Sequence, residues 1–244
     1  MTYCVGVKLE SGMVFASDSR TNAGIDQIAS FRKMAVYERP NDRVLILLTA
    51  GNLAICQVVV RTMEGLGQDD KLTLYNTPSI CDGAALVGEC LREVHKRDGT
   101  YLKENKLEAN ASFILGGQIK GQPQELFLIY PEGNFIEAST DTPYFQIGET
   151  KYGKPILDRV ITHDTDLQSA SKCLLVSFDS TMRSNLSVGL PIDLLIYKNN
   201  RLRVEHRTRI KEGDAYWGKL HDNWNQGIQQ LFSTLPDPSW DNPA

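Results

Sequence analysis

The sequence has no long hydrophobic run, no excess of positive charge and no recognisable metal-binding pattern. No apolar stretch approaches the roughly 20 residues that a membrane span needs, so no membrane partner is expected. The formal net charge is -4, which gives no electrostatic reason to expect a nucleic acid as partner. The four histidines are scattered and form no HExxH pair. Neither a metal nor another cofactor is therefore predicted.

The cysteines are few and form no CxxC pattern. There are five of them, an odd number, in apolar surroundings, which favours reduced core residues over disulfides or zinc ligands. The start of the chain has neither a positively charged segment nor a long apolar stretch, so no signal peptide is expected. These absences together predict a cytoplasmic protein.

The sequence begins Met1-Thr2 and continues at once into a segment with the character of a β-strand. Because Met1 precedes a small residue, we expect its removal to leave Thr2 as the mature N-terminus, with no other processing. An N-terminal threonine is a nucleophile that carries its own base, since its hydroxyl attacks while its α-amine takes the proton. The α-amine titrates near pH ~7.7–8, where a general base is most effective. A retained Met1 would block this amine.

Strand and helix patterns follow one another in groups along the chain. Apolar residues spaced three and four apart predict helices, and alternating or short continuous apolar runs predict strands. Asn52 is a predicted N-cap, and Ser79 with Asp82 resembles a capping box. Helices are predicted over residues 53–66, 151–161, 166–182 and 215–232, and from residue 80 toward a polar linker at 103–110. Strands are predicted over residues 3–9, 13–17, 31–37, 43–48, 111–115, 125–130, 134–138, 144–147, 192–197 and 202–208.

Groups of strands alternating with pairs of helices indicate antiparallel sheets with segregated helices rather than βαβ units. Two sheets flanked by two helix pairs would form a four-layer α/β/β/α sandwich, which is an α+β fold. We expect one domain over residues 1–210 and an assembly extension over 211–244, made of a helix and a Pro-rich tail. The segment 49–52 is predicted to break the strand before the first helix.

An ordered set of short motifs resembles the proteasome β-subunit family of N-terminal nucleophile (Ntn) hydrolases. The set includes a Thr-x-x-x-Gly start, an acidic residue 16 positions after Thr2, a lysine 31 positions after it, and Thr49-Ala50-Gly51. The opening MTYCVGVKLESGMVFASDSRTNAG, with SFRKM, is similar to the bacterial, proteasome-related family called Anbu, the ancestral β-subunit. The resemblance covers about residues 2–208 and implies the same fold, with a long C-terminal extension.

The resemblance implies a catalytic role for each of these residues. Thr2 would be the nucleophile, and Lys33 beside it would lower the pKa of its hydroxyl and of its amine. Asp18 would hold Lys33 as an ion pair; the alternative for these two residues is a solvated surface pair. The backbone N–H of Gly51, freed at the start of a helix, would stabilise the oxyanion.

The resemblance also implies a cleft that takes an extended peptide as an added strand. Thr49 lies where the family shapes its first specificity pocket, and a threonine there predicts a mixed side-chain preference. Phe31 and Leu53 are further pocket candidates, although core packing explains both equally well. The predicted substrate contacts are the Thr21 and Asn22 backbone, Thr49, Phe31 and Leu53.

Two positions depart from the family pattern. Glu149 stands where active subunits carry a serine, and a glutamate facing the Thr2 amine would favour its protonated form. The segment 183–189 keeps Ser187, a catalytic candidate by the resemblance, but lacks the family's aspartate, for which Ser184 or Asn185 is the alternative. We therefore expect slow turnover of generic peptides.

The main hypothesis is a threonine-type peptidase or amidohydrolase that cleaves peptide or other amide bonds within a self-assembled ring or spiral. The alternative is a proteasome-like scaffold or binding subunit with little or no catalysis. A third hypothesis, an amidase for a small molecule, shares the chemistry but not the peptide cleft. The chain contains no ATP-binding motif of its own.

Overall fold

The computed structural model describes residues 2–22, 28–65 and 71–239, so Met1 and the end of the tail lie outside the described residues. The chain divides into two compact units, Met1–Lys211 and Glu212–Ala244. The boundary lies one residue beyond the one predicted.

Antiparallel strands of the first unit form two large sheets within the described residues. The first sheet has the order β10 (Tyr144–Gly148), β1 (Tyr3–Leu9), β2 (Gly12–Asp18), β11 (Ile192–Lys198) and β12 (His206–Ile210). The second has the order β5 (Met34–Arg39), β6 (Arg43–Gly51), β7 (Ala111–Ile119), β8 (Glu125–Ile129) and β9 (Phe135–Glu137). A separate hairpin joins β3 (Arg20–Asn22) to β4 (Ile28–Ser30).

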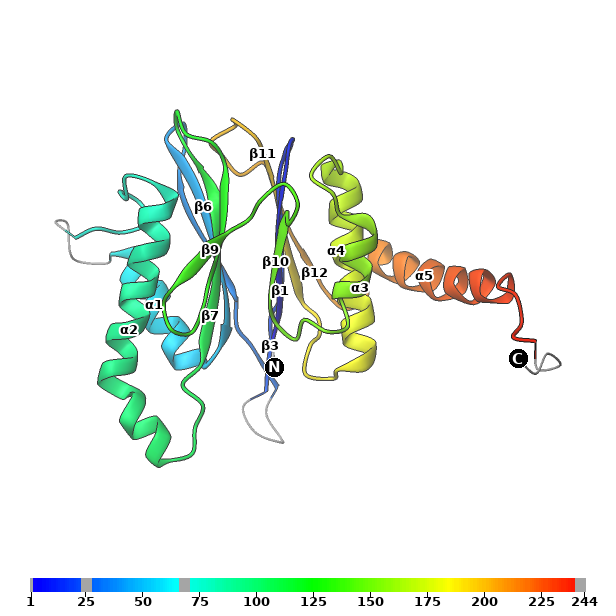
Figure 1. Ribbon diagram of the computed structural model, residues 1–244, viewed down its shortest axis with the longest axis horizontal. Helices are drawn as coiled ribbons and strands as arrows, with labels where there is room; N and C mark the ends of the chain where they lie inside the picture. Colours follow the sequence, from blue (N-terminus) through cyan, green and yellow to red (C-terminus); the bar gives the residue numbers. More distant parts are fainter. Residues whose placement is uncertain (1, 23–27, 66–70, 240–244) are drawn as a thin grey trace. The chain divides into compact units, whose positions relative to one another are not determined.

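Helices cover the outer faces of the two sheets (Figure 1). The second sheet carries α1 (Leu53–Glu64) and α2 (Ile80–Glu104), and the first carries α3 (Lys154–Val160) and α4 (Leu167–Ser184). The strands of the two sheets contact one another directly, as β1 does with β6 and β10 with β7. The predicted four-layer α/β/β/α sandwich is confirmed.

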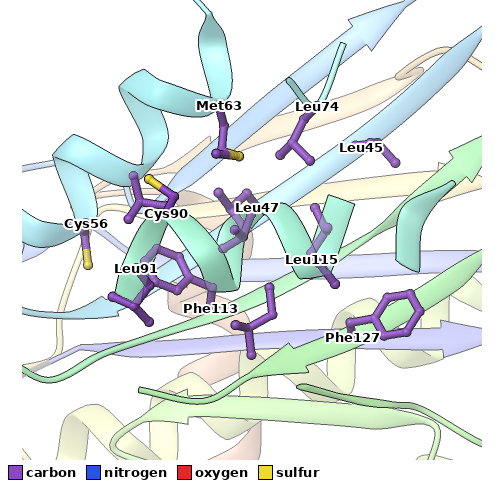
Figure 2. Packing of buried hydrophobic residues seen from close by; sticks show 14 of the residues in the cluster. Leu45, Leu47, Cys56, Met63, Leu74, Cys90, Leu91, Phe113, Leu115 and Phe127 are labelled. Atoms are coloured by element: carbon purple, nitrogen blue, oxygen red, sulfur yellow. The ribbon is translucent and has the colours of Figure 1, made fainter. Parts of the chain in front are cut away.

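Strand β6 lies between β5 and β7 in the second sheet and contributes to two cores. Leu45 and Leu47 pack in the cluster beneath α1 and α2, where Figure 2 shows Leu47 near Met63 and Leu45 near Leu74. Ile46 and Leu48 belong to the cluster between the two sheets. Because side chains alternate along a strand, a segment with helices on one face and a second sheet on the other must be apolar throughout.

The two predicted helix caps are present. Asn52 Oδ1 accepts hydrogen bonds from the amides of Ala54 and Ile55 at 3.1 and 3.3 Å, and α1 begins at the residue after Asn52. Ser79 Oγ accepts from the Asp82 amide at 3.0 Å and donates to its carboxylate at 2.7 Å. Both caps satisfy amides that have no partner within the helix.

Four predicted strand boundaries are wrong by three or four residues. β7 continues to Ile119 instead of ending at residue 115, since Gly116 and Gly117 pair with both neighbouring strands. β5 begins at Met34, because the preceding residues turn away: the Phe31 amide donates to Ser19 O, and Lys33 reaches Asp18. β6 does not break at residue 49 but pairs with β7 as far as Gly51. β12 begins at residue 206 rather than 202, because Leu202 adopts φ 48° in a wide turn.

The five cysteines are all free. Four are buried, but Cys81 is exposed near the start of α2, so the prediction that all five are core residues is wrong at this position. In the second unit, α5 (Ala215–Ser233) is capped by Asp214 Oδ1, which accepts from the Trp217 amide at 2.9 Å. None of the described helices combines the length and the apolar character needed to cross a membrane.

Candidate active site

The N-terminal end of β1 is fixed by the residue after Thr2. Tyr3 is fully buried, and its amide donates to Asp18 Oδ1 at 3.0 Å. Its phenol oxygen accepts from Gln146 Nε2 at 2.7 Å and lies 3.1 Å from Ser177 Oγ. The Tyr3 side chain is thus held by α4 and β10, and its amide by β2. These contacts fix the position of Thr2 at the end of β1.

Asp18 and Lys33 form a buried ion pair. Lys33 Nζ donates to both carboxylate oxygens of Asp18 at 2.9 Å and to the Arg20 carbonyl at 2.7 Å. Asp18 is 0 % exposed and Lys33 only 6 %. Burial raises the pKa of the Asp18 carboxyl, while the Lys33 ammonium and the Tyr3 amide act against that rise. The alternative of a solvated surface pair is excluded.

A cleft of about 470 Å³ opens beside this ion pair. It brings the hydroxyl-bearing Thr2 together with Lys33, while Asp18 lies behind Lys33 and does not line the cleft. Thr49 and Leu53, two of the predicted substrate contacts, form part of its wall. The cleft is lined by Thr2, Arg20, Lys33, Thr49, Ala50, Gly51, Asn52, Leu53, Cys56, Glu108, Asn110 and Gly148.

Gly51 ends β6 opposite Ala111, with φ 114°, and a Cβ here would collide with the Asn110 carbonyl. The prediction that a helix start frees the Gly51 amide is wrong, because α1 begins two residues later. Strand geometry supplies the orientation instead. The Thr49 amide donates to Lys33 O at 2.9 Å, and amides two residues apart on a strand face the same edge. The Gly51 amide is therefore expected to face the side on which Lys33 lies.

The family model for proteasome subunits matches residues 2–196. An Anbu (ancestral beta-subunit) structure from Yersinia bercovieri is 46% identical, covers 98% of this chain and 100% of its own, and superposes with a TM-score of 0.92. The chain belongs to the Anbu group of proteasome subunits. The helical assembly of the Anbu complex from Pseudomonas aeruginosa is 49% identical over 99% of this chain and 100% of its own, with a TM-score of 0.93. No match was found among curated protein sequences.

Two predicted residues of this Anbu chain lie away from the cleft lining. Phe31, in the loop before β5, is 37 % exposed. Ser187 is half-buried in the loop after α4, where its amide donates to Asn185 Oδ1 at 2.9 Å. The Thr21 and Asn22 backbone lies in β3, paired antiparallel with β4, and their side chains are outside the described part of the structure.

Sequence reasoning missed several cleft residues of the Anbu fold. Cys56 could have been predicted from the sequence, because it follows Leu53 by three residues and so lies on the same face of α1. Glu108 and Asn110 gave no signal, since they reach the cleft only through the pairing of β6 with β7. Arg20 lines the cleft next to the predicted residues, and its Nη1 donates to Leu186 O at 3.0 Å.

The end of β10 closes tightly on Thr2. Gly148 has φ 85°, and a Cβ there would collide with the Thr2 carbonyl oxygen. The next amide, that of Glu149, donates to the same carbonyl at 2.7 Å. The Glu149 carboxylate accepts from Asn185 Nδ2 at 3.0 Å. In the part of the chain that is described, no cluster of three His, Cys, Asp or Glu could hold a metal ion.

Proposed function

We propose that the chain is an N-terminal threonine hydrolase that cleaves peptide or other amide bonds. The proposal rests on one observation, the buried Asp18–Lys33 pair, in which the ammonium donates to both carboxylate oxygens. Lys33 lines the same cleft as Thr2. Membership of the proteasome subunit family supports the same chemistry. Removal of Met1 is required, because only then does Thr2 have a free α-amine.

In the proposed reaction, the neutral α-amine of Thr2 takes the hydroxyl proton while Oγ attacks the amide carbonyl. The Lys33 ammonium stabilises the developing alkoxide, and the Gly51 amide stabilises the oxyanion. The protonated amine then gives its proton to the leaving nitrogen, which leaves an ester on Thr2. A water molecule, activated by the same amine, hydrolyses the ester and restores the hydroxyl. Asp18 stays ionised and keeps Lys33 in place.

The proposed substrate is an extended peptide, with a mixed side-chain preference at the first pocket that is neither acidic nor basic. The last residues of β6 and the short strand β3, which carries Thr21 and Asn22, are the two segments that would pair with it. Thr49 and Leu53 would form a pocket of moderate size without charge. Phe31 has the least support as a specificity residue, since it lies outside the lining.

We further propose that the chain acts in the cytoplasm as a homo-oligomer, ring or spiral. The relative from Pseudomonas aeruginosa is described as a helical assembly, which supports self-association. Apolar side chains remain exposed on the second unit, among them Tyr216, Leu231 and Phe232. Light scattering coupled to size-exclusion chromatography of the full chain tests this, and a strictly monomeric protein would contradict it.

The second candidate is a scaffold or binding subunit. It is favoured by one observation, the hydrogen bond from the Glu149 amide to Thr2 O, because a carboxylate on a residue held this close to the N-terminus would weaken the amine as a base.

Hydrolysis of fluorogenic peptides decides between the two. The mature chain, shown by intact mass to begin at Thr2, is expected to release the fluorophore, and Thr2→Ser to retain part of the rate. Thr2→Ala is expected to fall to the background rate because it has no hydroxyl. Equal rates for the wild type and Thr2→Ala would overturn the hydrolase proposal and favour the scaffold.

A further inference from the structure

We propose that the Glu149 carboxylate accepts a hydrogen bond from the α-ammonium of mature Thr2, and that Asn185 holds the carboxylate in position. This inference rests on the proposed function and deepens it, because it identifies what controls the protonation of the catalytic base. Its consequence is an enzyme whose amine is held charged near neutral pH and whose activity rises toward alkaline pH.

The backbone already joins the two residues. Tyr3 pairs with Gly148 in the antiparallel register of β1 and β10, so Thr2 and Glu149 are the next opposite pair. The Glu149 amide confirms this by donating to Thr2 O at 2.7 Å. Glu149 follows β10 rather than lying in it, but this hydrogen bond holds its backbone against Thr2, which brings the N-terminus within reach of a glutamate side chain.

Gly148 keeps this approach close. Its φ of 85° and the collision that a Cβ would make with the Thr2 carbonyl leave room for no other residue there. This close approach of Gly148 to Thr2 places the following residue, Glu149, next to the N-terminus.

Asn185 fixes the direction of the carboxylate. Its Nδ2 donates to Glu149 Oε2 at 3.0 Å, and its Oδ1 accepts from the Ser187 amide at 2.9 Å. Its own amide donates to Thr181 O at 2.8 Å, which ties it to the end of α4. Glu149 itself does not line the cleft. The carboxylate therefore lies behind Thr2, where it can bind the amine without contacting the substrate.

Other charged groups around Thr2 also bear on the protonation of its amine. Lys33 and Arg20 are the cations on the cleft side of Thr2, and Lys33 is neutralised by the two-oxygen contact of Asp18. On α4, which packs against β1, the other charged groups near this end of the strand are the buried Asp179 and the exposed Arg183. Glu149 is the additional negative charge next to the nitrogen, and a neighbouring carboxylate favours an ammonium over a neutral amine.

The test measures the pKa of the Thr2 amine directly. Mature wild-type chain and Glu149→Gln are acetylated with trace acetic anhydride over a pH series, and modification of the N-terminal peptide is measured by mass spectrometry. The introduced amide keeps the size of the side chain but removes its charge. We expect the amine pKa to fall by between about one and three units, the range that a unit charge in hydrogen-bond contact gives between bulk water and a protein surface. The matched control is Glu10→Gln, the same change at the far end of β1, for which no shift is expected.

An unchanged amine pKa in Glu149→Gln would overturn the inference. Asn185→Ser is a second variant, which keeps the Glu149 carboxylate but removes the hydrogen bond that orients it. We expect a smaller fall in the amine pKa for this variant. Acetylation measures the amine whether or not the chain hydrolyses peptides, so the two proposals fail separately. A pKa fall in a chain with no Thr2-dependent hydrolysis would refute the proposed function alone. Where hydrolysis is measured, the alkaline rise of kcat/KM moves to lower pH by the same amount in Glu149→Gln.

Discussion

Thr2 lies between two polar groups that are built differently. On one side, Asp18 and Lys33 are 0 and 6 % exposed and share two contacts of 2.9 Å. On the other side, Glu149 and Asn185 are half-buried loop residues joined at 3.0 Å. The buried pair cannot change without a large loss of stability, whereas the loop pair can. In the proposed reaction, activation of the hydroxyl therefore depends on residues that stabilise the fold, while the charge of the amine depends on residues whose substitution costs less stability.

Breaking the buried pair should have the largest effect. Lys33→Met leaves the Asp18 carboxylate buried without its cation, which we expect to lower the free energy of unfolding by about 3 kcal/mol. Loss of the ammonium beside Thr2 should also reduce kcat/KM on the order of 1,000-fold. Urea denaturation and peptide hydrolysis measure the two effects. The control is Lys8→Met, which removes an exposed contact to Glu137 at 3.3 Å and should cost less than about 1 kcal/mol.

The stability loss in Lys33→Met should depend on pH. Lys33 opposes the rise that burial imposes on the pKa of Asp18, so removing it raises that folded-state pKa further above the unfolded value. A raised carboxyl pKa means that the folded state binds the proton more tightly. The variant should therefore recover stability as pH falls through the folded pKa and lose it as pH rises. A loss that is equal at acid and neutral pH would show that Asp18 is not the residue left unpaired.

Displacing Thr2 from the loop side should have an intermediate effect. Gly148→Ala combines an unfavourable φ with a collision against the Thr2 carbonyl, and we expect a loss of about 2–3 kcal/mol in unfolding free energy. A shift of Thr2 by about 1 Å can cost on the order of 100-fold in rate. Gly121→Ala is the matched control, since its φ is 78° but nothing lies within 4 Å of the added carbon. If the two variants behaved alike, the close approach of Gly148 to Thr2 would have no role.

The wall of the cleft should contribute less than either group. Leu53→Ala removes apolar surface from the lining, and we expect kcat/KM for peptides with apolar side chains to fall about tenfold. Phe31→Ala changes a residue outside the lining and should stay within about twofold. A larger effect for Phe31 than for Leu53 would reverse the assignment of the pocket.

The smallest effect concerns the cysteines. Burial raises the pKa of Cys56 to about 11, so its thiol is protonated at neutral pH although it lines the cleft. Iodoacetamide at pH 7 should therefore modify the exposed Cys81 well before Cys56, and Cys56 should react only as pH rises toward 11. Peptide mapping by mass spectrometry measures both sites. Rapid modification of Cys56 at pH 7 would mean that the cleft activates a second nucleophile.

The layers of the fold could be predicted because their signals are local. Asn52 and Ser79 mark helix starts through bonds to amides two or three residues away. The run from Val44 to Leu48 indicates burial on both faces without knowledge of its neighbours. Thr2, Asp18 and Lys33 were found because their order along the chain forms a specific pattern, even though each residue alone is uninformative.

The rest of the cleft depends on pairings between distant segments. Glu108 reaches the cleft, where its carbonyl accepts from Asn52 Nδ2 at 3.0 Å, because Ala111 pairs with Gly51 across β6 and β7. Glu149 reaches Thr2 because Gly148 pairs with Tyr3. Hydrophobic periodicity identifies strands but does not state which residues stand opposite, so such contacts become visible only once the sheet register is known.

The most direct test uses a peptide epoxyketone, which closes a ring only with a residue that offers both a hydroxyl and a free α-amine. The mature chain is incubated with it at pH 8 and mapped by tandem mass spectrometry. The proposed function predicts that the intact reagent adds to the N-terminal peptide at Thr2, that Thr2→Ala is unmodified, and that a chain retaining Met1 is unmodified. A mature chain that forms no adduct at Thr2, or forms as much in Thr2→Ala, would contradict the account.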